Sequence, residues 1–160
     1  MEKKKIIIVE DEPILRHSFV SVINQSSSYI VVGEYDNLKE ATQRIHQFSE
    51  LTVLLDVHLF GERTVDQVNK IKRINPYNKV IMLSSDSSHQ TIVECLRNGA
   101  DGYLVKEDAV MALGSFLDQS RKFDYVLSPG AANSISRFVQ TMTFAHAFNS
   151  DAEIDPTKEL

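Results

Sequence analysis

The chain has 160 residues, of which 42% are hydrophobic and 24% are charged, and this composition excludes a disordered chain and a membrane protein. Its net charge of −5 argues against nonspecific nucleic-acid binding, because phosphate neutralisation needs a basic patch. Acidic residues follow the short N-terminal apolar run and exclude a signal peptide, and Cys95 alone cannot form an internal disulfide. We therefore expect one cytoplasmic domain plus an appendage, without membrane association.

Short apolar runs rich in β-branched residues alternate along the chain with segments of helical period. The runs begin roughly every 25 residues, the length of one strand, one helix and two loops. We predict strands at 5–9, 29–35, 51–57, 79–85 and 102–106. Helices are predicted at 13–25, 38–48, 65–74, 88–98 and 108–121. Five such units imply an open, doubly wound α/β fold with a parallel sheet and right-handed crossovers.

Polar side chains stand where the predicted strands end. Glu10 and Asp11 follow the first strand, Asp56 ends the third, Ser84 ends the fourth, and Lys106 ends the fifth. Because ligands of open α/β sheets bind at the carboxyl ends of the strands, we expect these side chains to converge. Each of them alone has an ordinary explanation as a loop or turn residue. Their joint placement favours a functional site.

Three carboxylates within about 5 Å of each other repel by roughly 3 kcal/mol per pair, so the cluster must protonate or bind a cation. Oxygen ligands suit Mg²⁺, which keeps waters that phosphate groups can replace. Lys106 then supplies a positive charge and Ser84 a hydroxyl donor for phosphoryl oxygens. On this interpretation Asp56 is the nucleophile that forms an aspartyl phosphate.

Four motifs together resemble the response-regulator receiver domain of two-component systems over residues 3 to about 121. They are "IIIVEDEP", "VLLDVHLFG", "VIMLSS" and "GADGYLVKEDA". The resemblance implies a flavodoxin-like, CheY-like sheet of five parallel strands in the order 2-1-3-4-5, spanning a receiver domain of residues 1–122. It also implies a phosphoacceptor switch and not an enzyme, apart from catalysis of its own phosphoryl transfer and autodephosphorylation.

The resemblance assigns metal ligands to four positions. Glu10 and Asp11 match the acidic pair, Asp56 matches the phosphoacceptor, and His58 matches the position whose backbone carbonyl binds Mg²⁺.

The remaining site positions belong to the switch. Ser84 matches the hydroxyl that moves toward the phosphoryl group, Lys106 matches the phosphate-binding lysine, and Tyr103 matches the aromatic residue whose rotamer follows that hydroxyl. His58 and Asp86 flank the path of the attacking water, so we expect them to tune dephosphorylation.

The sequence "GYLVKEDA" is most similar to the NarL/FixJ subfamily, in which the receiver precedes a helix-turn-helix domain. Two positions depart from the family: Phe60 replaces a proline and Thr64 replaces a glycine. Without the rigid proline we expect a more mobile loop, and Thr64 adopts a positive φ at a higher cost than glycine does. The expected partners are a sensor histidine kinase and, after phosphorylation, a second copy of the chain, with DNA bound only through the output domain.

Four alternatives stay open from the sequence. The chain could be a stand-alone receiver acting in a phosphorelay or through a protein partner. A phosphatase of the haloacid-dehalogenase type would need a second aspartate where His58 stands. A degenerate receiver would lack charged site positions, which are filled here. A transition-metal site at His58 would need a second histidine at ligand spacing.

Residues 123–160 are predicted to be a helical linker and tail leading to an absent output domain. Ser128 is a candidate N-cap with Pro129 at the first helical position. An apolar stripe follows at Ile135, Phe138, Val139 and Met142 and must be covered by another surface. The segment 149–160 is polar and acidic and is predicted to be an irregular linker.

Overall fold

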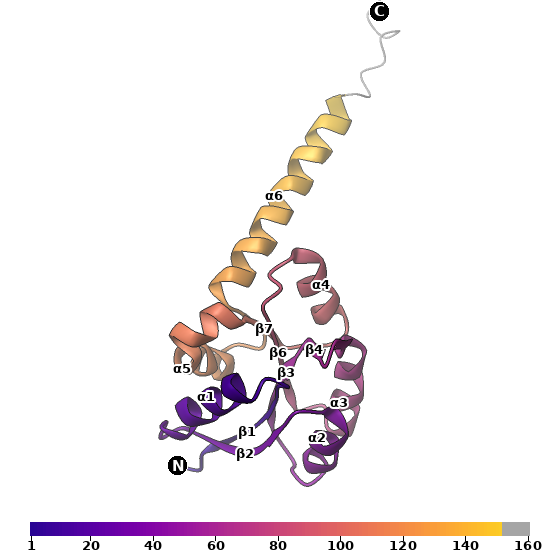
Figure 1. Cartoon of the computed structure of the whole chain (residues 1–160). Helices are drawn as coiled ribbons and strands as arrows, with labels where there is room; N and C mark the ends of the chain where they lie inside the picture. The colour runs from indigo at the N-terminus through magenta and orange to yellow at the C-terminus, as the bar shows by residue number, and fades with distance from the viewer. Residues whose placement is uncertain (152–160) are drawn as a thin grey trace, which may run out of the picture.

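The computed structural model describes the backbone of residues 1–151 and the side chains of residues 1–142. Its centre is a parallel sheet in the order β2-β1-β3-β6-β7-β8 (Figure 1). The strands that match predicted ones are β1 (Lys4–Val9), β2 (Tyr29–Tyr35), β3 (Thr52–Asp56), β6 (Lys79–Ser84) and β7 (Gly102–Val105). The predicted order of these five strands is therefore confirmed.

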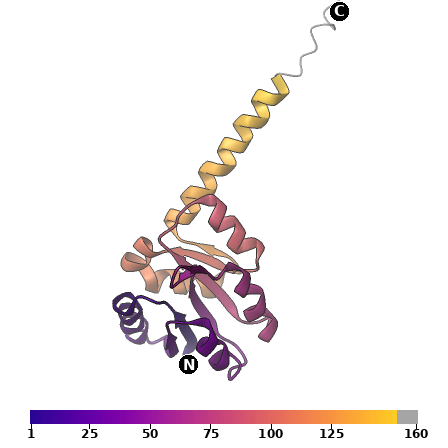
Figure 2. The same cartoon turned by 45° about the vertical axis from the view of Figure 1, so that its right-hand side comes forward.

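The sheet is buried on both faces, as the continuous apolar strands require. Successive residues of β1 belong to different cores, with Ile6 and Ile8 on one face and Ile7 and Val9 on the other. All four side chains are fully buried. The helices that cover one face are α1 (Pro13–Asn24) and α5 (Lys106–Lys122). Those on the other face are α2 (Leu38–Ile45), α3 (Val68–Ile74) and α4 (His89–Arg97), with a 3-10 turn, η1 (Val65–Gln67), before α3 (Figure 2).

The predicted count of five strands is wrong, because the sheet has a sixth strand, β8 (Val126–Leu127), parallel to β7. A Cβ on Gly102 would lie 2.8 Å from the Val126 carbonyl oxygen, so glycine is needed for this close approach. Two residues are too short to show a strand period, which is why the sequence pattern missed β8.

A short antiparallel hairpin follows the third strand and was also not predicted. It consists of β4 (His58–Leu59) and β5 (Glu62–Arg63), joined by Phe60 and Gly61. Both turn residues have positive φ, 50° and 81°. This is the backbone that a two-residue hairpin turn of type I′ requires, and Gly61 was its only sequence signal.

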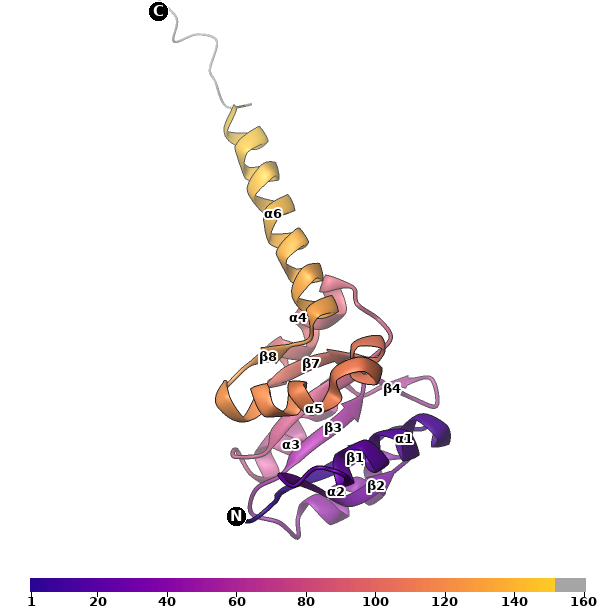
Figure 3. The ribbon, with the colours of Figure 1, turned by 90° about the vertical axis from the view of Figure 1, so that its left-hand side faces the viewer.

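The longest helix, α6 (Pro129–Asp151), leaves the sheet edge beside α4 and α5 and projects away from the domain (Figures 1 and 3). Ser128 stands at its start, as predicted, but the Ser128 hydroxyl accepts a hydrogen bond from the Val105 N–H. The Asp108 carboxylate of α5 instead accepts from the Gly130 N–H at 2.8 Å. The predicted N-cap position of Ser128 is confirmed, because its carbonyl accepts the first helical bond from the Ala132 N–H at 2.8 Å, but a neighbouring helix supplies the side-chain cap.

Only the beginning of the predicted apolar stripe of α6 is covered. Ile135 packs against the core, and the Phe138 ring stacks on His89 of α4 with centroids 4.0 Å apart. Val139 and Met142 are 53% and 54% exposed. The helix continues to Asp151, so the predicted irregular segment does not begin at 149, and its remaining residues 152–160 lie outside the described part.

No helix within the described residues is long and apolar enough to cross a membrane.

Candidate functional site

The predicted site residues meet at the edge of the sheet where its parallel strands end. Glu10 directly follows β1, Asp56 is the last residue of β3, Ser84 the last of β6, and Lys106 directly follows β7. Glu10 is 0% and Asp56 is 3% exposed, so two carboxylates are buried side by side. Such burial is costly for charged groups unless each has a partner.

Lys106 is the partner that the two buried carboxylates share. Its Nζ lies 2.8 Å from Asp56 Oδ2 and 3.0 Å from Glu10 Oε2. Burial acts to lower the pKa of Lys106, but the hydrogen bonds and charges of Asp56 and Glu10 outweigh it and raise that pKa above its usual value. The ammonium therefore stays charged and compensates one carboxylate.

The second buried carboxylate is left without full compensation. Burial, followed by the nearness of Asp56, raises the pKa of Glu10 to about 7, although Lys106 opposes the shift. Near neutral pH the cluster thus holds a proton or takes up a cation.

The geometry fits a small cation with oxygen ligands. Glu10, Asp11 and Asp56 each offer a carboxylate oxygen, and these oxygens lie within 4.8 Å of one another. Glu10 Oε2 is buried, and among the described residues only the Lys106 ammonium, at 3.0 Å, lies against it. Oxygen-only ligand sets suit Mg²⁺, so this cluster can hold the predicted ion.

The β4–β5 hairpin lies over this cluster and bonds to two of its carboxylates. The His58 N–H donates to Asp56 Oδ1 at 3.0 Å, and the Phe60 N–H donates to Asp11 Oδ2 at 2.8 Å. The imidazole of His58 is exposed. The assignment of its backbone carbonyl as a metal ligand stays a prediction.

Thr64 does not need the positive φ that would be costly for a threonine. Thr64 has φ −107°, a value that needs no glycine, and the positive φ angles fall on the hairpin turn instead. Thr64 is 3% exposed, and its hydroxyl donates to the Asp56 carbonyl at 2.6 Å. The loop is thus closed by hydrogen bonds where a mobile loop was expected, and sequence reasoning missed this role of Thr64.

The predicted switch residues are connected through Asp86. Ser84 Oγ accepts a hydrogen bond from the Asp86 N–H at 3.0 Å, and the hydroxyl of the fully buried Tyr103 donates to the Asp86 carbonyl. The Asp86 carboxylate accepts from the Ser88 N–H at 2.8 Å and from the Thr91 hydroxyl at 2.6 Å. Asp86 therefore connects Ser84 and Tyr103 to the first turn of α4. Its partners there, Ser88 and Thr91, were not singled out from the sequence.

Burial and hydrogen bonds together set the protonation of Tyr103 and Asp86. Burial raises the pKa of Tyr103, so its hydroxyl remains a donor. For Asp86, burial is outweighed by the hydrogen bonds from Thr91 and Ser88, which lower its pKa below the usual value. Asp86 is thus a charged anchor for the start of α4, and its predicted effect on dephosphorylation is not tested by these contacts.

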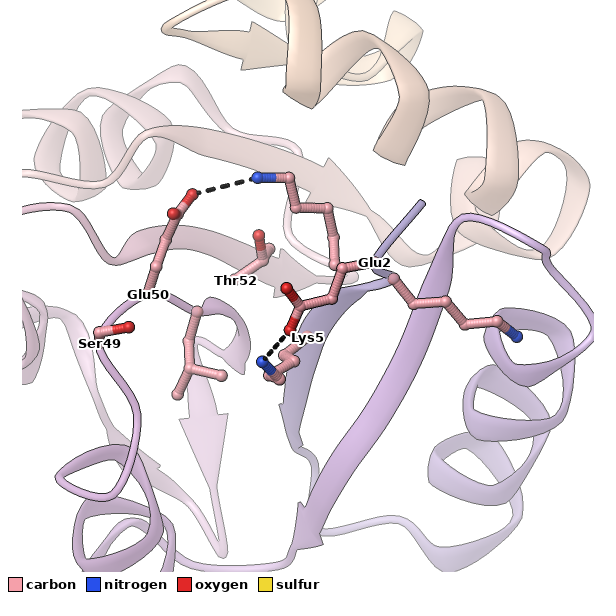
Figure 4. Close-up of a pocket in the computed structure, with 8 residues that line it drawn as sticks. Glu2, Lys5, Ser49, Glu50 and Thr52 are labelled. Atoms are coloured by element: carbon pink, nitrogen blue, oxygen red, sulfur yellow. Dashed lines mark hydrogen bonds and ion pairs between the residues drawn. The ribbon is translucent and has the colours of Figure 1, made fainter.

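A second polar hollow lies at the opposite edge of the sheet, where β1 and β3 begin (Figure 4). Its charged side chains pair with each other: Lys4 with Glu50 at 3.4 Å and Lys5 with Glu2 at 3.0 Å. The carboxylates of both pairs are mainly exposed, which leaves no buried charge that a ligand would have to compensate.

Comparison with known proteins identifies the family of the chain. The family model of the response regulator receiver domain matches residues 6–116. The nitrate/nitrite response regulator NarL of Escherichia coli K12 is 26% identical over 127 residues, which are 79% of this chain and 59% of NarL. The transcriptional regulatory protein CitB of Klebsiella pneumoniae is 30% identical over 106 residues, 66% of this chain and 45% of CitB. The chain thus spans about half the length of these relatives.

Solved structures agree on the fold. A LuxR-family response regulator from Aurantimonas has a TM-score of 0.76 at 20% identity, over 85% of this chain and 97% of that one. RcsB of Salmonella typhimurium has a TM-score of 0.77 at 19% identity, over 85% and 68%. The predicted CheY-like architecture and the likeness to NarL are thereby confirmed, and the chain belongs to the response regulator receiver domain family.

Proposed function

We propose that this chain accepts a phosphoryl group on Asp56 from a sensor histidine kinase. The observation that carries the proposal is the buried pair of Asp56 and Lys106, beside the carboxylates of Glu10 and Asp11. An Asp56 oxygen forms a bond to phosphorus while the bond from phosphorus to the donor nitrogen breaks, and the electron pair of that bond stays on the nitrogen. The product is an aspartyl phosphate.

The other site residues are proposed to position the phosphoryl group and to neutralise its negative charge. Glu10, Asp11, Asp56 and the His58 carbonyl are proposed to hold Mg²⁺, which neutralises charge on the phosphoryl oxygens when bound. Lys106 Nζ lies 2.8 Å from Asp56 Oδ2. It is proposed to bind an oxygen of the phosphoryl group once that group is attached to Asp56.

The conformational response is proposed to begin at Ser84. Its hydroxyl turns toward the phosphoryl group and releases the Asp86 N–H, which alters the bonds of Asp86 to α4 and of Tyr103 to Asp86. Asp86 and the exposed His58 are proposed to tune how fast water removes the phosphate. The altered α4 surface then favours a second copy of the chain.

We further propose a division into a receiver, residues 1–122, and a linker, residues 123–160, that leads to a DNA-binding output domain of a cytoplasmic transcription regulator. Support comes from the NarL relative, of which the chain matches 59%, and from α6, whose first turns dock on α4. The full reading frame of the gene tests this proposal: a stop codon directly after Leu160 would favour a stand-alone receiver.

Intact mass spectrometry after incubation with acetyl phosphate and Mg²⁺ tests phosphoryl acceptance. We expect one phosphate on the wild type and on Asp124→Asn, a matched variant of an exposed aspartate, and none on Asp56→Ala. A phosphate adduct that persists in Asp56→Ala contradicts the assignment. At 100 times its dissociation constant, Mg²⁺ should also add about 2.7 kcal/mol to the free energy of unfolding.

Sedimentation of the protein with and without beryllofluoride tests the switch. We expect a larger assembly with beryllofluoride in the wild type and a monomer in Ser84→Ala. An unchanged mass in the wild type would contradict phosphorylation-dependent association.

A further inference from the structure

Residues 56–64 form a loop that is closed by a hydrogen bond from the side chain of Thr64. Glycine, the residue that the family usually has at this position, cannot make this bond. Where the family has glycine, this chain has a threonine buried at 3% exposure. Its Oγ1 donates to the carbonyl of Asp56 at 2.6 Å and lies 3.3 Å from the carbonyl of Val57. Its backbone N–H donates to the Val57 carbonyl at 2.9 Å. Thr64 therefore binds the peptide of the phosphoacceptor itself.

The position of Asp56 explains why such a contact is useful. Asp56 is the last residue of β3, so the chain leaves the sheet immediately after it. A buried carbonyl at this point needs a donor, and leaving it unpaired would be costly. The Thr64 hydroxyl supplies that donor from the far end of the hairpin.

The hairpin closed by Thr64 is also the element that orients the site carboxylates. Its first strand donates the His58 N–H to the reacting side chain of Asp56, and its turn donates the Phe60 N–H to Asp11. These two bonds are made by residues between Asp56 and Thr64. The geometry of these two hydrogen bonds therefore depends on the bond between Thr64 and Asp56, which fixes the base of the hairpin, where its two ends meet.

We propose that Thr64 is a positioning residue for phosphoryl transfer at Asp56. Its hydroxyl fixes the base of the hairpin, so that the His58 and Phe60 amides hold the carboxylates of Asp56 and Asp11 in place for the phosphodonor and the cation. This inference rests on the proposed function of Asp56. It assigns to Thr64 the geometric role that proline and glycine have in the family loop.

The kinetics of phosphorylation by acetyl phosphate test this role. Thr64→Val keeps the shape of the side chain and removes the donor, whereas Thr64→Ser keeps the donor. Small misplacements of reacting groups cost large factors in rate, so we expect Thr64→Val to lower the maximal rate about tenfold or more, with the KM for acetyl phosphate changed less than about twofold. Thr64→Ser should stay within about threefold of the wild-type rate.

A matched control removes the hydroxyl of another threonine, Thr52, which lies in the strand that carries Asp56. Thr52 begins β3 at the opposite edge of the sheet, and Thr52→Val should leave both kinetic parameters unchanged. If Thr64→Val does not fold, Thr64→Ala is measured against the same criteria.

Three outcomes overturn the inference. A wild-type rate in the variant without the hydroxyl means that the hydroxyl does not position the site. An equal loss in Thr64→Ser, which keeps the donor, means that the rate does not follow the hydroxyl. A wild-type protein that takes no phosphate on Asp56 defeats the proposed function, and the inference with it, so the two failures are distinguishable.

Discussion

The two edges of the sheet carry the same kinds of charged residue in opposite environments. At the carboxyl edge, Lys106 bonds Asp56 at 2.8 Å, with side chains 17% and 5% exposed. At the amino edge, Lys4 bonds Glu50 at 3.4 Å, with side chains 52% and 62% exposed (Figure 4). Water screens the second pair, whereas the first is paired only with protein atoms and any bound cation. The comparison shows that burial, more than residue type, separates a candidate site from a solvated edge.

Removal of the Lys106 ammonium should have the largest effect on the free energy of unfolding. Lys106→Met leaves the carboxylates of Asp56 and Glu10 buried without a cation, so the free energy of unfolding should fall by about 3 kcal/mol at pH 8 without Mg²⁺. Urea denaturation measures the loss. It should shrink at pH 5, where Glu10 binds a proton, and an unchanged stability at pH 8 would show that the buried charges are compensated elsewhere.

The proton on Glu10 should produce the next largest effect. Because the pKa of Glu10 in the folded protein, about 7, lies above the ordinary glutamate value of 4.5, its contribution to stability is complete below pH 4.5 and is lost as pH rises through 7. Without Mg²⁺, the wild type should lose on the order of 3 kcal/mol relative to Glu10→Gln between pH 4.5 and pH 8. Parallel pH profiles of the two proteins, from urea denaturation in chelator, would contradict the raised pKa.

An intermediate effect is expected where α6 docks on α4. Phe138→Ala removes the ring that stacks on His89, so the first turns of α6 should exchange amide hydrogens faster and the protein should lose about 1 kcal/mol. Hydrogen exchange with mass spectrometry measures this. Val139→Ala is the matched control, because Val139 is the next residue of α6 and its position is half-exposed. Equal exchange in both variants would mean that the stack does not hold α6.

The amino edge should give the smallest effect. Glu50→Gln removes the exposed pair with Lys4 and should change the free energy of unfolding by less than about 0.5 kcal/mol, with the difference vanishing in high salt. Denaturation at low and high ionic strength checks this. A loss as large as that of Lys106→Met would remove the distinction between the two edges.

Much of the fold follows from local pattern. The five predicted strands and the helices α1, α4 and α5 have ends within two residues of those predicted, because apolar periods of two and 3.6 are local properties of the chain. The end of α2 was placed less well, because α2 ends at Ile45 where 48 was predicted, and the interruption of α5 at Ala112, with φ −149°, was not predicted. Helix ends depend on tertiary contacts that the local pattern does not contain.

The site divides in the same way. Glu10, Asp56, Ser84 and Lys106 could be found from the sequence, because each stands at or directly after the end of a strand and parallel strands end at one edge. The roles of Thr64, and of Thr91 at Asp86, could not be found, because each depends on a partner across a loop. The departure of Phe60 from the family's proline predicted a more mobile loop, whereas the structure has a hydrogen-bonded hairpin there.

The sequence by itself determined the α/β fold class and the polar residues that stand at the strand ends, Asp56 among them, since these depend on periodicity and on the ends of the apolar runs. Only the tertiary structure decided that β8 joins the sheet beside Gly102, that Asp108 caps α6, and that Glu10 is buried beside Lys106. The reason is physical: a charge, a cap or a short strand acquires its free energy from partners distant in the chain, and burial sets how strongly they interact.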